Sequence, residues 1–241
     1  MENPKQVTEK KHRDKKQLIA LNDEQETELL KVAYSTNFKH GLMIELALNT
    51  SLRVNELVNL IISDLYLKGE TPYIRIHDRP ASTVKEYNYA SFKCKTDLSN
   101  RENPLDKIIA KKMRDYLKGR TIGYVFESQR GSDGFKHFNR NSVINMINKY
   151  AKKCKNINTV NHCIGFHTTR RTYASKLLDD NVPINQISFV LGHADISTTL
   201  RYLKQIRKIN MKLIRSVLQK ANEQKEKNWT IKQWGIEIEK R

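Results

Sequence analysis

Apolar residues recur at intervals of three and four along most of the chain, which is the spacing of one face of a helix. Between residues 39 and 48, for example, Leu42, Met43 and Leu46 would share a face. The same pattern predicts helices over these ranges: 23–33, 39–48, 53–60, 106–119, 142–152, 168–179 and 183–191, with a further helix after Ser197. The chain is therefore predicted to be mainly helical.

Short motifs indicate where several of these helices begin and end. Asn22 and Gln25 have the spacing of a capping box, so the first helix should begin directly after Asn22. Pro183 suits the first position of a helix, and Gly192 suits the position just past its end. Ser197 is a candidate cap for the helix that carries Tyr202.

The middle of the chain changes to a period of two. Residues 73–77 and 87–94 alternate between apolar and polar side chains, which predicts two strands. A polar tip at 95–100 would return the chain through a third strand at 101–105, and Val125-Phe126 reads as a short strand end. The expected fold class is α+β, mainly helical, with a small three-stranded antiparallel sheet.

The charge of the chain is strongly positive. Its 241 residues include 44 Lys plus Arg against 26 Asp plus Glu, a formal net charge of +18. A chain this basic is expected to bind nucleic acid, because released counterions favour association; a merely basic, soluble surface is the alternative. Residues 1–20 are predicted to be a basic flexible arm, which either contacts phosphates or is a leader without a role.

The cysteines and the apolar runs restrict the cellular setting. Cys94, Cys154 and Cys163 show no C-x-x-C spacing, so neither a disulfide framework nor a zinc site is indicated. A reducing compartment agrees with this, and we expect a cytoplasmic protein. The N-terminus lacks the pattern of a signal peptide, and no run of about 18 apolar residues is present, so no membrane partner is expected.

A tyrosine among cationic side chains is the strongest chemical signal. Tyr202 follows His193 closely, and His167 and Arg170 are spaced so that they share one face of a helix. A tyrosine near phosphate-binding groups points to covalent attack on a phosphodiester. Surface ion pairs for the arginines, and packing roles for the histidines, are the plainer alternatives.

Four segments that occur in order along the chain resemble one family. They are Asn49-Thr50-Ser51-Leu52-Arg53-Val54-Asn55-Glu56-Leu57, then Lys95-Thr96-x-x-Ser99-x-Arg101-x-x-Pro104-Leu105, then His167-x-x-Arg170, and last Leu191-Gly192-His193 with Ser197-Thr198-Thr199-x-x-Tyr202. Together they resemble the catalytic domain of tyrosine recombinases, the phage integrase family with its Xer-like members, over residues 21–203. The chain departs from the family at Ser51, where glycine is usual, and at Arg171, where histidine or lysine often follows the second arginine.

The resemblance implies a site-specific DNA recombinase, an integrase of the kind used in mobile elements, that cleaves and rejoins strands through a covalent 3′-phosphotyrosine. The catalytic residues that it implies are Arg53, Lys95, His167, Arg170, His193 and the nucleophile Tyr202. The two arginines would hold phosphate oxygens, Lys95 would protonate the leaving oxygen, and the histidines would accept the tyrosine proton and donate to the phosphate. Lys93 competes with Lys95, because alternation along a strand puts both on the same side.

The resemblance also implies partners. These are double-stranded DNA and further copies of the chain, as a homotetramer on paired sites, with no small-molecule substrate and no cofactor. A metal site is not indicated, because no acidic cluster accompanies the four segments. The amphipathic tail at 204–241 either packs on its own domain or docks on a neighbouring protomer. Most family members carry an N-terminal helical domain as well, and this chain begins where the catalytic domain would begin.

Three other functions compete with this one. A type IB topoisomerase-like strand-passage enzyme uses similar chemistry, but such enzymes generally have lysine where His167 stands. The second is a non-catalytic helix-turn-helix DNA-binding protein, because the two helices around Asn181-Val182-Pro183 could imitate that motif. An accessory protein or recombinase relic is the third, and the full set of catalytic residue types argues against it.

Overall fold

The computed structural model describes residues 19–79, 89, 91–95, 99–128, 136–162, 164–206, 219 and 223. The chain divides into a compact unit of residues 1–206 and a second unit of residues 207–241. Nearly all of the predicted arm at 1–20 lies outside the described residues. The predicted tail at 204–241 does so as well, apart from the end of the last helix and two isolated positions.

The first three helices follow the apolar pattern closely. They are α1 (Asp23–Thr36), α2 (Phe38–Thr50) and the short α3 (Val54–Val58). The capping box is confirmed: the Asn22 side chain accepts a hydrogen bond from the Gln25 amide at 2.9 Å, and the Gln25 side chain accepts one from the Asn22 amide at 3.2 Å. Two of the orphan donors at the start of α1 are thereby satisfied.

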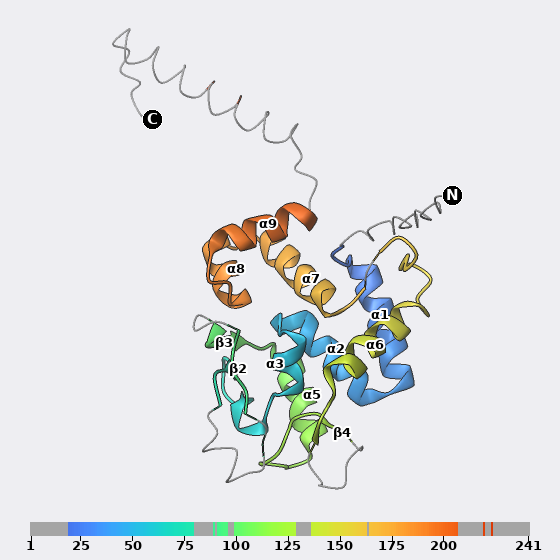
Figure 1. Ribbon diagram of the computed structural model, residues 1–241, viewed down its shortest axis with the longest axis vertical. Helices are drawn as coiled ribbons and strands as arrows, with labels where there is room; N and C mark the ends of the chain where they lie inside the picture. Colours follow the sequence, from blue (N-terminus) through green and yellow to red (C-terminus); the bar gives the residue numbers. More distant parts are fainter. Residues whose placement is uncertain are drawn as a thin grey trace, which may run out of the picture. The chain divides into compact units, whose positions relative to one another are not determined.

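The main apolar core is built around α2. Helices α5 (Lys107–Leu117) and α6 (Arg140–Ala151) complete this part of the fold with α1, and α2 contacts both α1 and α5. Leu42, Met43 and Leu46 of α2 are 0% exposed. Because α2 is apolar on nearly every side, it can be covered by helices on several faces, and Figure 1 shows it between α1, α5 and α7.

A second, smaller cluster joins the last three helices. These are α7 (Phe166–Asp179), α8 (Ile184–Leu191) and α9 (Ile196–Ile206), which contact one another pairwise. Its buried members are Ala174, Ile187, Leu191 and Leu203. Helix α7 also packs against α2, so it belongs to both parts of the unit (Figure 1). None of the described helices is long and apolar enough to cross a bilayer.

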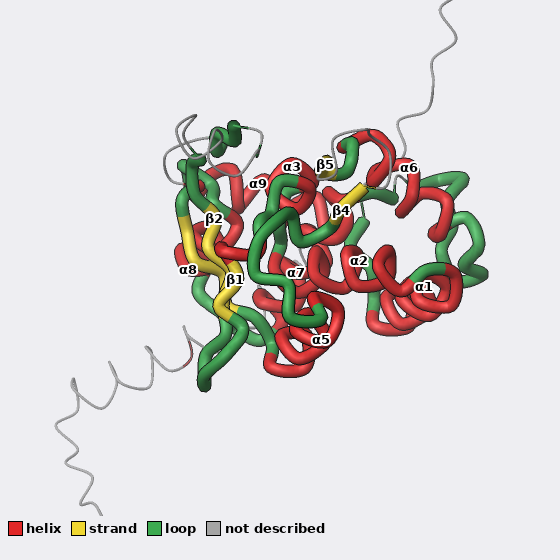
Figure 2. The backbone as a smooth tube through the Cα atoms, turned by 90° about the horizontal axis from the view of Figure 1, so that it is seen from below, coloured by secondary structure: helices red, strands yellow, loops and turns green. Residues whose placement is uncertain are grey.

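Three short strands form an antiparallel sheet. Strand β1 (Leu65–Tyr66), which follows the 3-10 turn η1 (Ile62–Asp64), pairs with β2 (Tyr73–Ile76), and β2 pairs with β3 (Arg101–Pro104). Figure 2 shows this sheet beside α8, in agreement with contacts between α8 and β3. A separate pair joins β4 (Glu127–Ser128) to β5 (Lys136–His137).

The predicted three-stranded antiparallel sheet is confirmed, but one of its expected strands was wrong. Among the described residues of 87–94, only Phe92 pairs, in an isolated bridge with Arg79. The third strand of the sheet is β1 instead, which lies at the edge beside β2. A strand of two residues is too short to show alternation, and sequence periodicity therefore missed it. The expected strand end at Val125-Phe126 is buried, and the strand itself begins at Glu127.

Two predicted helix ends also shift. Pro183 is the cap of α8 and not its first helical residue. At α9, Asp195 replaces Ser197 as the cap, because the Asp195 carboxylate accepts a hydrogen bond from the Ser197 amide at 2.8 Å. A carboxylate is a favourable partner at a helix N-terminus, where the backbone dipoles leave a partial positive charge. Gly192 stands just past the end of α8, as predicted, and its backbone is in the left-handed conformation.

Candidate functional site

The junction between α2 and α3 places Arg53. Helix α2 ends at Thr50, and Ser51 turns the chain in the left-handed region with φ of 54°. This conformation explains why glycine is usual at this position, since a side chain there is strained. Arg53 is the cap of α3, and its own amide donates to the Glu56 carboxylate at 2.7 Å. The turn therefore fixes the backbone from which the Arg53 side chain departs.

The first turn of α7 places Arg170. The Thr168 hydroxyl accepts a hydrogen bond from the Gly165 amide, which caps the helix start, and α7 packs against α2. Arg170 is buried, with 3% of its surface exposed. Its guanidinium donates to the Ser51 carbonyl and, at 2.8 Å, to the Leu191 carbonyl. Arg170 thus spans from the end of α2 to the end of α8.

The end of α8 brings His193 next to Arg170. After Gly192, the His193 ring lies with Nδ1 at 2.9 Å from the Thr199 hydroxyl and Nε2 at 3.5 Å from an Arg170 nitrogen. Burial, and then the positive charges of Arg170 and Arg53, lower the pKa of His193 to about 4. The ring is therefore neutral near pH 7. A side chain at position 192 would meet the Arg101 guanidinium at 3.0 Å, so glycine also leaves room for the arginines.

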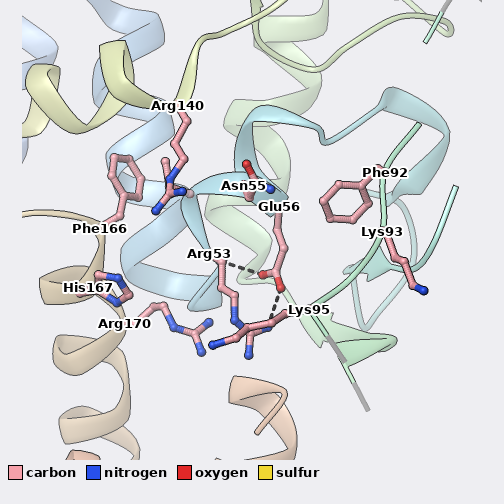
Figure 3. A pocket seen from close by; sticks show the side chains of 11 residues that line it. Arg53, Asn55, Glu56, Phe92, Lys93, Lys95, Arg140, Phe166, His167 and Arg170 are labelled. Atoms are coloured by element: carbon pink, nitrogen blue, oxygen red, sulfur yellow. Dashed lines mark hydrogen bonds and ion pairs between the residues drawn. The ribbon is translucent and has the colours of Figure 1, made fainter. Parts of the chain in front are cut away.

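One pocket, of about 460 Å³, is lined by four of the predicted residues. Arg53, Lys95, His167 and Arg170 all line it. In Figure 3 the Lys95 side chain runs toward the guanidinium groups of Arg53 and Arg170. Partial burial, and then the charges of Arg171 and Arg170, lower the pKa of His167, and the charge of Lys95 adds a smaller effect in the same direction. The pocket is thus strongly cationic, and the His167 imidazole that lines it is neutral near pH 7.

The two candidate lysines differ in direction. Both Lys93 and Lys95 are exposed and line the pocket. Figure 3 shows the Lys93 side chain turning away from the arginines, below Phe92. The charge of Lys95, moreover, is among the causes that lower the pKa values of His167 and His193. The geometry therefore favours Lys95 over Lys93, a choice that alternation could not make.

Tyr202 lies on α9, the helix that follows His193. Its backbone is part of the described chain, but the position of its side chain is outside the description. The structure thus brings Arg53, Lys95, His167 and Arg170 into one pocket, sets His193 against Arg170, and puts Tyr202 on the next helix. Within the part of the chain that the structure describes, no group of three His, Cys, Asp or Glu side chains could hold a metal ion.

Sequence reasoning gave no role to three further residues of the site. Glu56 and Arg101 form a buried ion pair at 2.9 Å beside Arg53, and Arg140 lines the pocket from the first turn of α6. The spacing of Arg53 and Glu56, like that of a helix cap and its third residue, could have pointed to Glu56. Nothing local in the sequence pairs Glu56 with Arg101, because the two come together only in the fold.

Known proteins resemble this chain in sequence. The model of the phage integrase family matches residues 14–208. A tyrosine recombinase XerA of Thermococcus kodakarensis is 29% identical over 187 residues, which cover 77% of this chain and 57% of the relative. A tyrosine recombinase of Agathobacter rectalis is 30% identical over 164 residues, 68% of this chain and 47% of the relative. The chain thus spans about half the length of these relatives.

Solved structures share the fold. The crystal structure of XerA recombinase superposes with a TM-score of 0.61 at 21% identity, over 84% of this chain and 65% of that one. The Tn1549 transposon integrase, solved in complex with circular intermediate DNA, gives a TM-score of 0.66 at 19% identity, over 86% of this chain and 68% of that one. With a family model that matches most of its length and the same fold, this chain belongs to the phage integrase family.

Proposed function

We propose that this chain is the catalytic part of a site-specific DNA recombinase, which cleaves and rejoins DNA strands through a covalent 3′-phosphotyrosine at Tyr202. One observation carries the proposal. Four side chains from three distant segments, Arg53, Lys95, and His167 with Arg170, line a single cationic pocket. A phosphodiester is the substrate that such a pocket suits, since its negative charge is matched by the two guanidinium groups and the ammonium. The relatives, which are named tyrosine recombinases, support the same assignment.

The arginines would hold the scissile phosphate. Guanidinium groups bind phosphate oxygens in a bidentate way and stay charged at any physiological pH. Arg53 and Arg170 each donate to a carbonyl at the end of α8, Gly192 at 2.7 Å and Leu191 at 2.8 Å. These bonds set the plane of each guanidinium in advance. Charge that develops on the phosphate oxygens in the transition state would meet donors that need no rearrangement.

The protons need an acceptor and a donor. Tyr202 has to lose its proton to attack, and His167, whose pKa is lowered, is neutral and able to accept it near pH 7. Lys95, whose side chain runs toward the two arginines, would protonate the leaving oxygen. His193 would complete the set: in the tautomer with its hydrogen on Nε2 and with Nδ1 accepting from the Thr199 hydroxyl, it would donate to the phosphate.

A suicide substrate tests the proposal. A nicked duplex that loses its cleaved end traps the covalent adduct, which is seen as a shifted band on a denaturing gel. The parent protein should form the adduct, and Tyr202→Phe should bind the same DNA without forming it. Tyr66→Phe is the matched control, because Tyr66 lies on β1 and stacks on Tyr73, outside the pocket. An undiminished adduct with Tyr202→Phe would remove Tyr202 from the role, and DNA binding without any adduct in the parent would indicate a binding protein.

Lys95 has a test of its own. Lys95→Ala should slow cleavage of ordinary DNA, because the leaving oxygen is no longer protonated. A substrate with sulfur in place of that bridging oxygen has a leaving group that needs no proton, and it should restore the rate. Lys93→Ala is the control and should need no rescue. If sulfur fails to rescue Lys95→Ala, the lysine binds phosphate and is not the acid.

Assembly and location follow from the same proposal. Strand exchange between two DNA sites requires a catalytic chain for each strand, so we place a homotetramer on paired sites, working in the cytoplasm where the DNA is accessible. The tail at 204–241 would link neighbouring protomers. Truncation after Lys208 should leave a folded chain that binds a single site but does not assemble on two, as measured by native gel electrophoresis. Normal recombination by the truncated chain would contradict this role of the tail.

A further inference from the structure

The Arg101 side chain lies wholly behind the pocket. It is 0% exposed and does not line the cavity. Its guanidinium donates to the Val190 carbonyl at 2.9 Å, to the Ser99 carbonyl at 2.9 Å, and to both Glu56 oxygens at 2.9 and 3.2 Å. A substrate phosphate cannot reach a group enclosed in this way. Any effect of Arg101 on the reaction must therefore act through its neighbours.

The most important neighbour is Glu56, which two arginines share. Arg53 donates to Glu56 Oε1 at 2.7 Å, and Arg101 donates to both carboxylate oxygens. Glu56 is 4% exposed, so water does little to screen these charges. One carboxylate between two guanidinium groups leaves a net charge of one positive unit. Without Arg101, the Glu56 carboxylate would be balanced by Arg53 alone, and the net charge of the pair would be zero.

A second set of contacts joins the same arginines to α8. The carbonyls of Val190, Leu191 and Gly192, at the end of this helix, accept hydrogen bonds from Arg101, Arg170 and Arg53 respectively. The last carbonyls of a helix have no partner within it and carry a partial negative charge. Three guanidinium groups from β3, α7 and the start of α3 thus converge on one helix end. His193 follows directly, so its place depends on the same bonds.

We propose that Arg101 is a positioning residue: it offsets the charge of Glu56 and fixes the end of α8, so that Arg53 presents a net positive charge to a phosphate in the pocket. This inference rests on the proposed function of the pocket as a phosphodiester site. Arg101 itself touches no substrate. Its loss should weaken transition-state stabilisation more than DNA binding, because binding draws on many surface cations whereas the reacting phosphate draws on Arg53.

Paired substitutions at positions 56 and 101 test the charge balance. Arg101→Gln should slow single-turnover cleavage at saturating DNA by at least about tenfold, less than the roughly 10²–10³-fold expected when a direct donor is lost. Its affinity for DNA should change by no more than about threefold. Adding Glu56→Gln to Arg101→Gln should recover most of the rate, because the uncompensated carboxylate is gone. Arg75→Gln, in an exposed pair with Glu102, is the matched control and should cleave like the parent.

Arg101→Lys separates charge from packing and keeps the test valid if Arg101→Gln does not fold. Lysine retains the charge but loses the fork of donors, so its rate should fall between those of the parent and Arg101→Gln. Thermal melting identifies the folded variants, and rates are compared below the lowest melting temperature. Equal losses with Lys and Gln, together with no recovery by Glu56→Gln, would show that Arg101 only fills space and would overturn the inference.

A measurement without DNA separates this inference from the proposed function. Orthovanadate, a phosphate mimic, should bind the parent protein, bind Arg101→Gln at least about fivefold more weakly, and regain affinity in the double variant, as followed by vanadium NMR. If the parent never cleaves DNA but vanadate follows this order, the proposed function fails and the inference on Arg101 stands. If the parent cleaves DNA and Arg101→Gln both cleaves and binds vanadate like the parent, the inference is overturned.

Discussion

The two larger apolar clusters of the described residues differ in size and in the helices that form them. The larger one surrounds α2 and extends from α1 through the sheet to α6, whereas the smaller one contains only the facing residues of α7, α8 and α9. The candidate site lies where they adjoin. Arg53 and Lys95 come from segments beside the larger cluster, and His193 and the helix that carries Tyr202 come from segments beside the smaller cluster.

The boundary between the clusters is largely polar. Arg170 bonds to Ser51 on one side and to Leu191 on the other, and the Ser51 hydroxyl donates to the Val190 carbonyl at 3.3 Å. Apolar packing is non-directional, but hydrogen bonds fix distance and angle. The comparison teaches that the large core supplies stability, whereas the relative placement of the proposed catalytic groups rests on directional bonds from arginines to the end of α8.

Removing Arg170 should break this arrangement and give the largest effect. Arg170→Ala loses a proposed phosphate donor and both bonds across the boundary, so cleavage should fall roughly 10²–10³-fold. The free energy of unfolding should fall by about 3 kcal/mol, because two buried carbonyls lose a charged donor. Single-turnover kinetics and urea denaturation measure the two effects. Arg75→Ala should change stability by less than about 1 kcal/mol. An Arg170→Ala protein that cleaves like the parent would mean that apolar contacts suffice.

Similar cavities made in the two clusters should have different effects on the cleavage rate. Leu46 in α2 and Ile187 in α8 are both 0% exposed, and each change to alanine should cost about 2–5 kcal/mol of unfolding free energy. Leu46→Ala should leave the cleavage rate of the folded protein intact. Ile187→Ala should lower that rate as well, since α8 carries the carbonyls that hold the arginines. Equal cleavage rates in the two variants would contradict the division of roles.

The pH dependence of the unfolding free energy should report on the burial of His193, which lies beside the smaller cluster. The pKa of His193 is about 4 in the folded chain, against an ordinary value of 6.5. Between these values the unfolded chain binds more protons, so stability should fall as the pH is lowered from 6.5 toward 4. The melting temperature of the parent should therefore drop more over this window than that of His193→Gln. Parallel curves for the two proteins would place His193 in a water-like environment.

The smallest effect is expected at the start of α1. Asn22→Ala removes the cap of α1 and should cost about 1 kcal/mol of unfolding free energy. Because α1 belongs to the larger cluster and its cap touches no pocket residue, the cleavage rate should not change. Thermal melting and the suicide-substrate assay check both statements. A loss of cleavage here would show that stability of the large core and placement of the site are not separate.

Much of the fold was predictable because its signals are local. The helices follow from an apolar period that any short window contains, and the capping box of Asn22 and Gln25 involves neighbours in sequence. Strand β1 was missed because two residues cannot show a period. The segment at 87–94 alternates like a strand, yet among its described residues only Phe92 forms a β-bridge, because strand pairing depends on a partner elsewhere in the chain.

For the site, the sequence alone determined which residue types stand in the four motifs and, by their order, the family to which the chain belongs. Tertiary structure decided how they are arranged: that Lys95 and not Lys93 runs toward the arginines, that Glu56 is shared by Arg53 and Arg101, and that three guanidinium groups meet the end of α8. The reason is physical. These contacts join residues far apart in the chain, and their strength depends on distance, direction and burial, none of which leaves a periodic trace in the sequence.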